Sequence, residues 1–177
     1  MEPSDGHLVA RVVGARDSQA FDALVVRHQA HVRNWLRQLT RDAARADDLA
    51  QETFIRAWDR LGSLKNPAKF SSWVMKIAYT SFLQSHRKRG SEQRLSEALQ
   101  QEPSAQEIEL DGAVVDLPKL LSVLSDDERT AMILCYAHDL SHSEIADITD
   151  WPLGTVKSHI ARGKAKIRER FDLNHEP

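Results

Sequence analysis

The stretch from Ser141 to Phe171 constrains the fold more than any other part of the chain. Ser141 and Glu144 have the Ser-x-x-Glu spacing of a capping box, in which the hydroxyl and the carboxylate satisfy first-turn amides reciprocally. A short helix is therefore predicted to start here. Pro152 cannot donate a backbone hydrogen bond but suits a first helical turn, so a second helix is predicted from Pro152 to about Phe171. Two helices joined by so short a turn form a helix-turn-helix.

The second of these helices is basic. Val156, Ile160, Ile167 and Phe171 give it one apolar stripe. Between Val156 and Phe171 there are six Lys or Arg residues and one acid, Glu169, whereas the whole chain has a formal net charge of -2. Most charge runs are solvated helix faces, but a helix-turn-helix delivers such a helix to the major groove of DNA. The sequence therefore favours a DNA-binding module.

Composition indicates an ordinary globular protein. The chain has 177 residues, of which 41% are hydrophobic and 28% charged, so it is long enough for one domain or two small ones. No apolar run approaches the roughly 18 residues of a spanning helix, and the N-terminus lacks the pattern of a signal peptide. We therefore expect a cytoplasmic protein without membrane insertion. With Cys135 as the only cysteine, neither a disulfide nor a thiolate metal site is expected.

Two helices are predicted near the N-terminus. Residues 8–13 form a short apolar helix that Gly14 can end. From residue 21 to residue 39 apolar positions recur every three or four residues, with Asp17 or Ser18 available as the N-cap. This period predicts a long helix with one buried face.

A third helix is predicted over residues 46–61. Its apolar residues can face inward, which leaves Asp48, Gln51 and Glu52 together on the outside, one turn apart. From spacing alone, such a trio is an ordinary exposed surface.

A loop at residues 62–69 precedes a fourth helix, predicted from about residue 67 to residue 89. This helix interleaves aromatic residues with basic ones and ends in His-Arg-Lys-Arg, a composition typical of surfaces that stack bases while holding a nucleic-acid backbone. Tyr79 and Phe82 fit core packing and base contact equally well.

The chain changes character after residue 90. Residues 91–128 contain ten acids against two basic residues, and residues 91–105 are predicted to be a solvated linker. Its acidity could mimic nucleic acid, keep two basic modules apart, or simply maintain solubility. Ser125 and Glu128 then repeat the capping-box spacing before another apolar helix. The predicted fold is all-α, with two small helical domains over residues 5–90 and 106–172.

With both halves placed, the chain resembles the compact bacterial RNA polymerase sigma factors of the extracytoplasmic-function (ECF) type. The matching stretches are DLAQETFIRAW at Asp48 to Trp58, FSSWVMKIAYT at Phe70 to Thr80, and IADITDWPLGTVKSHIARGKAKIR at Ile145 to Arg168. The resemblance implies a sigma region 2-like bundle, the acidic linker, and a sigma region 4-like helix-turn-helix. It also implies core RNA polymerase, promoter DNA and an anti-sigma factor as partners, with no cofactor and no metal.

The resemblance assigns roles to three sets of residues. Those implied to bind the clamp of core polymerase are Asp48, Gln51, Glu52, Phe54 and Trp58. Those implied to melt the duplex and read the −10 element are Lys65, Asn66, Lys69, Tyr79, Thr80, Arg87 and Arg89. The candidates for the −35 element are Thr155, Lys157, Ser158, His159, Arg162 and Lys166.

The sequence departs from the family pattern at three positions. Thr80 replaces the usual Asn beside the melted strand, and His159 replaces the usual Arg. Gly163 stands where the family usually has Ala, which should weaken the helix by about 1 kcal/mol. These departures bear on the promoter sequence that is recognised, and leave the inference of polymerase binding intact.

The predicted function is that of an alternative sigma factor, which binds core polymerase and directs transcription initiation at specific promoters. The alternative is a stand-alone helix-turn-helix regulator, which would use the last helix identically but has no need for the Asp-Leu-x-Gln-Glu helix. An enzyme is not expected, because the chain has no Gly-rich phosphate loop, paired-carboxylate metal site or nucleophile motif.

Overall fold

A computed structural model of the protein describes residues 3–97 and 121–171. In these residues all regular structure is helical, as the sequence predicts, and no β-strand occurs among them. Residues 98–105 of the predicted linker lie outside the described residues. Every helix in the described part of the chain is too short or too polar to span a lipid bilayer.

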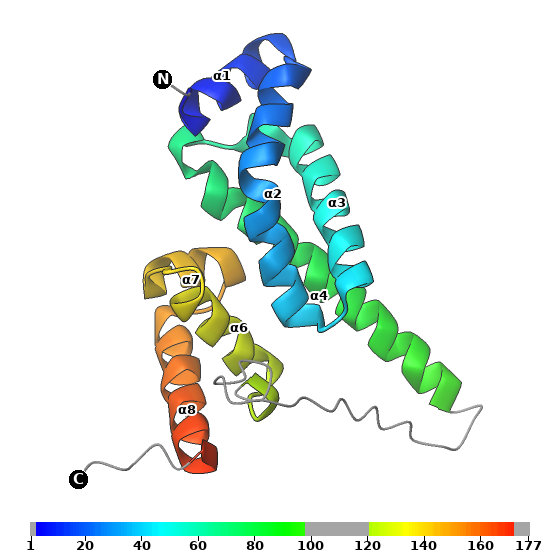
Figure 1. Cartoon of the computed structure of the whole chain (residues 1–177), viewed down its shortest axis with the longest axis vertical. Helices are drawn as coiled ribbons and strands as arrows, with labels where there is room; N and C mark the ends of the chain where they lie inside the picture. The colour runs from blue at the N-terminus through cyan, green and yellow to red at the C-terminus, as the bar shows by residue number, and fades with distance from the viewer. Residues whose placement is uncertain (1–2, 98–120, 172–177) are drawn as a thin grey trace, which may run out of the picture.

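The N-terminal domain consists of α1 (Asp5–Ala15), α2 (Ser18–Thr40), α3 (Ala43–Arg60) and α4 (Phe70–Glu97) (Figure 1). Asp17 is the N-cap of α2, and its side chain accepts a hydrogen bond from the Ala20 amide at 3.1 Å. The expectation that Gly14 ends the first helix is wrong. The helix continues to Ala15, and Arg16 closes it with a left-handed φ of 50°.

The connection between α3 and α4 and the end of α4 both differ in detail from the predicted loop and helix. The loop contains two short 3₁₀ turns, Leu61–Ser63 and Pro67–Lys69. Helix α4 continues past residue 89 to Glu97, so the first part of the predicted linker is helical. No proline interrupts residues 90–97, and Gly90 alone costs only about 1 kcal/mol of helix propensity.

The C-terminal domain consists of α6 (Asp126–Tyr136), α7 (His142–Thr149) and α8 (Leu153–Phe171). Both predicted capping boxes are present. Ser125 and Glu128 begin α6, and Ser141 and Glu144 begin α7, each pair with reciprocal hydrogen bonds. The short turn after α7 leads directly into α8, which confirms the predicted helix-turn-helix.

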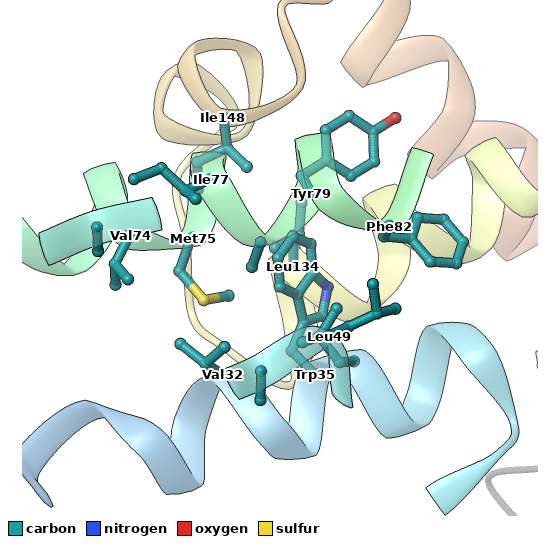
Figure 2. Packing of buried hydrophobic residues seen from close by; sticks show 14 of the residues in the cluster. Val32, Trp35, Leu49, Val74, Met75, Ile77, Tyr79, Phe82, Leu134 and Ile148 are labelled. Atoms are coloured by element: carbon teal, nitrogen blue, oxygen red, sulfur yellow. The ribbon is translucent and has the colours of Figure 1, made fainter. Parts of the chain in front are cut away.

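The two domains pack against each other and share one continuous apolar core. Trp35 of α2 is fully buried, and its ring stacks on Tyr79 of α4 at 6.2 Å between centroids. Leu134 of α6 and Ile148 of α7 are buried in the same cluster (Figure 2). Helix α7 lies along α4, and α6 lies along α2. We call this packing of one domain on the other the closed arrangement.

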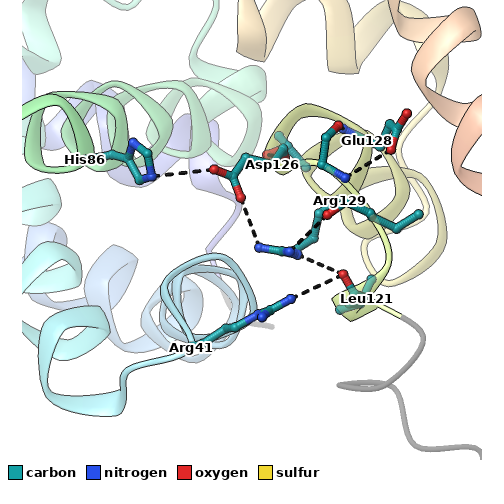
Figure 3. A network of polar contacts seen from close by, with 9 residues as sticks. Arg41, His86, Leu121, Asp126, Glu128 and Arg129 are labelled. Carbon is teal, nitrogen blue, oxygen red and sulfur yellow. Dashed lines mark hydrogen bonds and ion pairs between the residues drawn. The ribbon is translucent and has the colours of Figure 1, made fainter. Parts of the chain in front are cut away.

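Polar contacts surround this shared core. Lys76 of α4 forms an ion pair with Asp150, which ends α7. Arg41 donates a hydrogen bond to the backbone carbonyl of Leu121 at 3.3 Å, and His86 lies 3.5 Å from the Asp126 carboxylate (Figure 3). Exposed ion pairs contribute little to stability, so the closed arrangement depends mainly on apolar burial.

Gly163 allows α8 to approach α6 closely. A Cβ added at Gly163 would lie 2.9 Å from Cγ of Met132 and 3.6 Å from Cδ2 of Leu124. The close packing of α8 on α6 therefore favours a residue without a Cβ at position 163, which helix propensity does not reveal. The backbone cost of this glycine is offset by the contact between the two helices.

We expect Gly163→Ala to leave the stability of the protein unchanged or lower, although Ala favours a helix interior by about 1 kcal/mol. In a Met132→Ala background, where the clash is removed, the same substitution should stabilise by about that amount. Chemical denaturation of the wild type, the two single variants and the double variant gives the change in the free energy of unfolding in each background. Equal gains in the two backgrounds would show that Met132 does not restrict position 163.

Candidate functional site

A surface hollow lies between α2 and α3 in the N-terminal domain. Its volume is about 550 Å³. The apolar part of its wall comes from Phe21, Val25, Ala50, Phe54, Ile55 and Trp58, and the polar part from Gln29, Arg33, Asp47, Asp48 and Gln51. We call it the α2/α3 groove.

Four of the five residues implied to bind polymerase line this groove. Asp48 and Gln51 are exposed at its surface, whereas Phe54 and Trp58 form part of its floor. Glu52 does not line it and instead forms an ion pair with Arg56 on the same helix. Ile55, which was not predicted from the sequence, also lies in the groove with 58% of its surface exposed. The available signal was an apolar residue three positions after Glu52, about one helical turn further along α3.

Aromatic contacts and ion pairs connect the residues around the groove. Trp58 packs edge-to-face on Phe21 with 5.0 Å between ring centroids, and the Arg16 guanidinium lies 5.9 Å from the Trp58 ring. Asp47 is held by Arg33 at 3.1 Å and by Arg37 at 3.2 Å. An exposed apolar floor with carboxylate and amide groups beside it suits an amphipathic helix that carries basic residues.

Six of the seven residues implied to contact the −10 region are exposed. Lys65, Asn66 and Lys69 lie in the α3–α4 connection, where the Asn66 side chain caps the second 3₁₀ turn by accepting from the Ala68 amide. The other three lie along α4: Thr80, Arg87 and Arg89. The hydroxyl of Thr80 donates to the Lys76 carbonyl of its own helix at 2.9 Å.

Tyr79 is the exception. It is 4% exposed, and its ring lies between Trp35 of its own domain and Trp151 of the other, at 6.2 and 6.1 Å between centroids. Burial raises the pKa of the Tyr79 phenol. Phe82 is also buried. For these two residues, which the sequence left open, the closed arrangement favours core packing, and a base could not reach either ring.

The candidates for the −35 element occupy two sides of α8. Lys157 and Ser158 are exposed, and Thr155 is half-buried. The ring of His159 packs on Trp151 at 4.8 Å between centroids and lies 3.0 Å from the Arg162 guanidinium.

Two cations of α8 turn toward α6. Lys166 donates a hydrogen bond to the Glu128 carboxylate at 2.7 Å, and Arg162 lies 3.7 Å from it. Burial opposes ionisation of Glu128, but hydrogen bonds from Lys166 and from the Ser125 amide outweigh it, so the pKa of Glu128 lies below its ordinary value. Lys166 therefore has a structural partner within the domain, whereas Lys157 presents its charge to solvent.

The turn between α7 and α8 lies against α4. Asp150 pairs with Lys76, and Trp151 covers Tyr79. The helix that was predicted to handle the melted strand is thus in contact with the module that was predicted to read the duplex.

Comparison with known proteins matches both domains. The family description "Sigma-70 region 2" fits residues 24–92, and "Sigma-70, region 4" fits residues 115–167. The ECF RNA polymerase sigma-E factor of Haemophilus influenzae is 30% identical over 95% of this chain and 95% of its own length. A probable RNA polymerase sigma factor of Xanthomonas campestris pv. campestris, RfaY, is 31% identical over 87% of this chain, which spans only 42% of that longer protein.

The fold also matches a solved structure. The sigma factor RpoE of Bartonella quintana, determined in complex with the anti-sigma factor NepR, superposes with a TM-score of 0.72 over 88% of this chain and 98% of its own, at 27% identity. The similarity covers both helical domains in their order along the chain. The chain therefore belongs to the ECF-type sigma factors, the alternative sigma factors that direct RNA polymerase to specific promoters.

Proposed function

We propose that this sigma factor binds core RNA polymerase through the α2/α3 groove. The observation that carries the proposal is the exposed apolar floor at Ile55, next to Asp48 and Gln51, in a hollow large enough for the side chains of a partner helix. The clamp helices that the family resemblance implies would contribute basic residues toward these polar groups. Burial of Ile55 by such a helix would contribute apolar free energy to the binding.

The same proposal assigns promoter contacts to the two basic surfaces. The α3–α4 connection and the exposed cations of α4 would hold the nontemplate strand at the −10 element, and α8 would enter the major groove at the −35 element. On α8, Lys157 and Ser158 are the most accessible of the candidate residues.

The closed arrangement would have to open before both promoter elements are bound. Trp151 covers Tyr79, and the turn before α8 lies on α4, so one domain restricts the DNA access of the other. Separating the domains exposes the shared apolar core, which costs free energy. Binding to polymerase would supply that free energy, and the free protein should then bind promoters poorly.

We further propose that an anti-sigma factor regulates the protein, since the structural neighbour RpoE was solved with one. The protein would act in the cytoplasm and carry out no chemistry of its own, because the polymerase makes the RNA. The stand-alone regulator is disfavoured by the α2/α3 groove, for which such a protein has no use.

Transcription by purified core polymerase tests the function directly. With this protein added, RNA synthesis on a library of genomic fragments should start at a small set of sites that share −35 and −10 sequences. A stand-alone regulator would instead be indicated if the start sites were the same as with core polymerase alone and the protein by itself bound DNA at nanomolar concentration.

Contacts of α8 should appear in the salt dependence of promoter binding. We expect Lys157→Ala to reduce the slope of log affinity against log salt by about 1 for the holoenzyme, because one phosphate contact is lost. Lys166→Ala should change this slope less, since Lys166 already pairs with Glu128. Filter binding at several salt concentrations gives both slopes, and equal changes would contradict the assigned orientations.

A further inference from the structure

A second cavity lies where the two domains meet, at the end of the shared core opposite to Lys76. Its volume is about 260 Å³. Helices α2, α3, α4 and α6 all contribute to its wall. Its charged lining consists of Arg41, Arg45, His86, Arg89, Asp126 and Arg129. Four guanidinium groups therefore surround a small space that contains one carboxylate.

The hydrogen bonds of two of these arginines have clear structural roles. Arg129 is buried and donates to the carbonyls of Leu121 and Leu124 and to Asp126. Arg41 donates to the same Leu121 carbonyl (Figure 3). These bonds satisfy backbone acceptors, but a neutral carbonyl does not cancel a positive charge. The surplus of charge in the cavity remains.

Arg45 is only partly hydrogen-bonded. Its Nη2 donates to Ser85 at 3.1 Å, whereas its buried Nε has no hydrogen-bond partner among the described residues. Burial and the neighbouring charge of Arg89 both lower the pKa of Arg45, and Asp42 only partly opposes them. A buried guanidinium donor without an acceptor is costly, because such groups are normally paired.

We propose that this interdomain cavity binds a small polyphosphate, either free or as the diphosphate part of a nucleotide. Phosphate oxygens accept bidentate hydrogen bonds from guanidinium groups, and two phosphoryl groups could engage cations on opposite walls. The limited volume favours such a compact anion over a folded partner. Of the four arginines, Arg89 is also among the promoter contacts proposed above, so this inference depends on Arg41, Arg45 and Arg129.

Binding in this cavity would act on the closed arrangement. Arg41, Arg45 and Arg89 belong to the N-terminal domain, whereas Arg129 belongs to the C-terminal domain. A ligand that contacts both sets meets its complete site only when the domains are together. It should therefore shift the population toward the closed arrangement.

Calorimetric titration of the full chain with inorganic pyrophosphate at low ionic strength tests the site. We expect saturable binding with one site per chain, and Arg45→Gln should weaken it about tenfold or more through the loss of charge-assisted hydrogen bonds. Arg60→Gln is the matched control, because Arg60 is an exposed arginine on the same helix outside the cavity. Equal losses in the two variants, or no saturation, would overturn the proposal.

Domain closure supplies a second measurement. Dyes on cysteines placed at exposed Asp59 and Arg168, in a chain with Cys135→Ser, report the distance between the domains by energy transfer. Pyrophosphate should raise the closed fraction of the labelled chain that keeps Arg45, and should not raise it in the labelled chain with Arg45→Gln. Binding without any change in closure would show that the anion does not bridge the domains.

Two further experiments test whether DNA or the chain's own carboxylates bind in this cavity instead of a polyphosphate. If a short single-stranded DNA displaces pyrophosphate at an equal concentration of phosphate groups, the arginines are part of a DNA path and the proposal is wrong. If pyrophosphate binds only after Glu107, Glu109 and Asp111 are changed to Gln, Gln and Asn, carboxylates of the chain itself are the natural occupants, which also overturns it.

Discussion

Acidification from about pH 7.5 to about pH 5.5 is expected to lower the ratio of closed to open protein about tenfold, because two half-buried histidines meet between the domains. His31 of α2 and His138, two residues after α6, meet with ring nitrogens 3.0 Å apart and ring centroids 4.2 Å apart. The ring of His138 also packs against Trp35 at 6.5 Å. Two protonated imidazoles cannot share this site without repulsion.

The direction of this pH effect follows from the pKa values of His31 and His138. Burial lowers the pKa of His138 from 6.5 to about 4, with a smaller contribution from His31, and Asp139 opposes the shift. Burial, with His28, also lowers the pKa of His31. The closed form thus binds fewer protons than the open form. The free-energy preference for the closed form is fully present above about pH 6.5. It declines as the pH falls through that value and levels off below about pH 4.

Other charged groups at the interface have smaller or opposite effects. His28 faces His31 but is itself paired with Asp5 at 2.8 Å, within the N-terminal domain. Protonated His86 would attract Asp126 across the domains and favour closure. Both side chains of that pair are more than half exposed, so solvent weakens their attraction. We therefore expect the half-buried pair of His31 and His138 to determine the sign of the pH effect.

Energy transfer between dyes at positions 59 and 168 measures this opening as a function of pH. A chain with His31→Gln and His138→Gln keeps polar groups at the interface but loses the titration, so its closed fraction should depend little on pH. His7→Gln, which changes an exposed histidine of α1, is the control and should behave as the wild type. A pH response that survives the double substitution would exclude this pair as its cause.

Local sequence signals predicted most of the individual helices. The capping boxes at Ser125 and Ser141 and the N-cap at Asp17 formed as expected, because each depends on residues within one helical turn. The same local reasoning failed at Gly14, where the helix continues to Ala15. It also gave an incomplete account of Gly163, whose role depends on Met132 in another helix.

Features that depend on distant contacts could not be read from the chain. Tyr79 remained undecided because its environment is completed by Trp151 of the other domain. His31 and His138 meet across 107 positions, and nothing in their local patterns links them. The groove was found only in part. The polar trio marked its α3 side, whereas Phe21 and Val25 on α2 join it through tertiary packing.

Substitutions in the α2/α3 groove are expected to have the largest effect on function. Ile55→Asp should change stability little, because the side chain is exposed and single surface substitutions usually fall within about 0.5 kcal/mol. At an interface with polymerase the same change would bury an unpaired carboxylate in place of an apolar contact. We expect a loss of about 2–4 kcal/mol in binding, which corresponds to about 30-fold to 1,000-fold.

Gln51 and Glu52 test the polar side of the same surface. Gln51 lines the groove, and Glu52 forms only a partly exposed pair with Arg56, so replacing both with Ala should leave the fold intact. If they contact basic residues of the polymerase, loss of both should weaken binding by about 2–5 kcal/mol. The helix-turn-helix is untouched by these changes, so DNA binding by α8 should be retained.

The most direct test of the account is the affinity of labelled protein for core RNA polymerase, compared between Ile55→Asp and Val13→Asp. Both substitutions place an Asp at a half-exposed Val or Ile of a helix, since Val13 is 54% exposed and Ile55 58%, but Val13 lies on α1 and does not line the groove. We predict that Val13→Asp binds polymerase as the wild type does, whereas Ile55→Asp binds at least 30-fold more weakly and fails to start promoter-directed transcription. Equal, undiminished affinity of the two folded variants would contradict the assignment of the α2/α3 groove as the polymerase-binding surface.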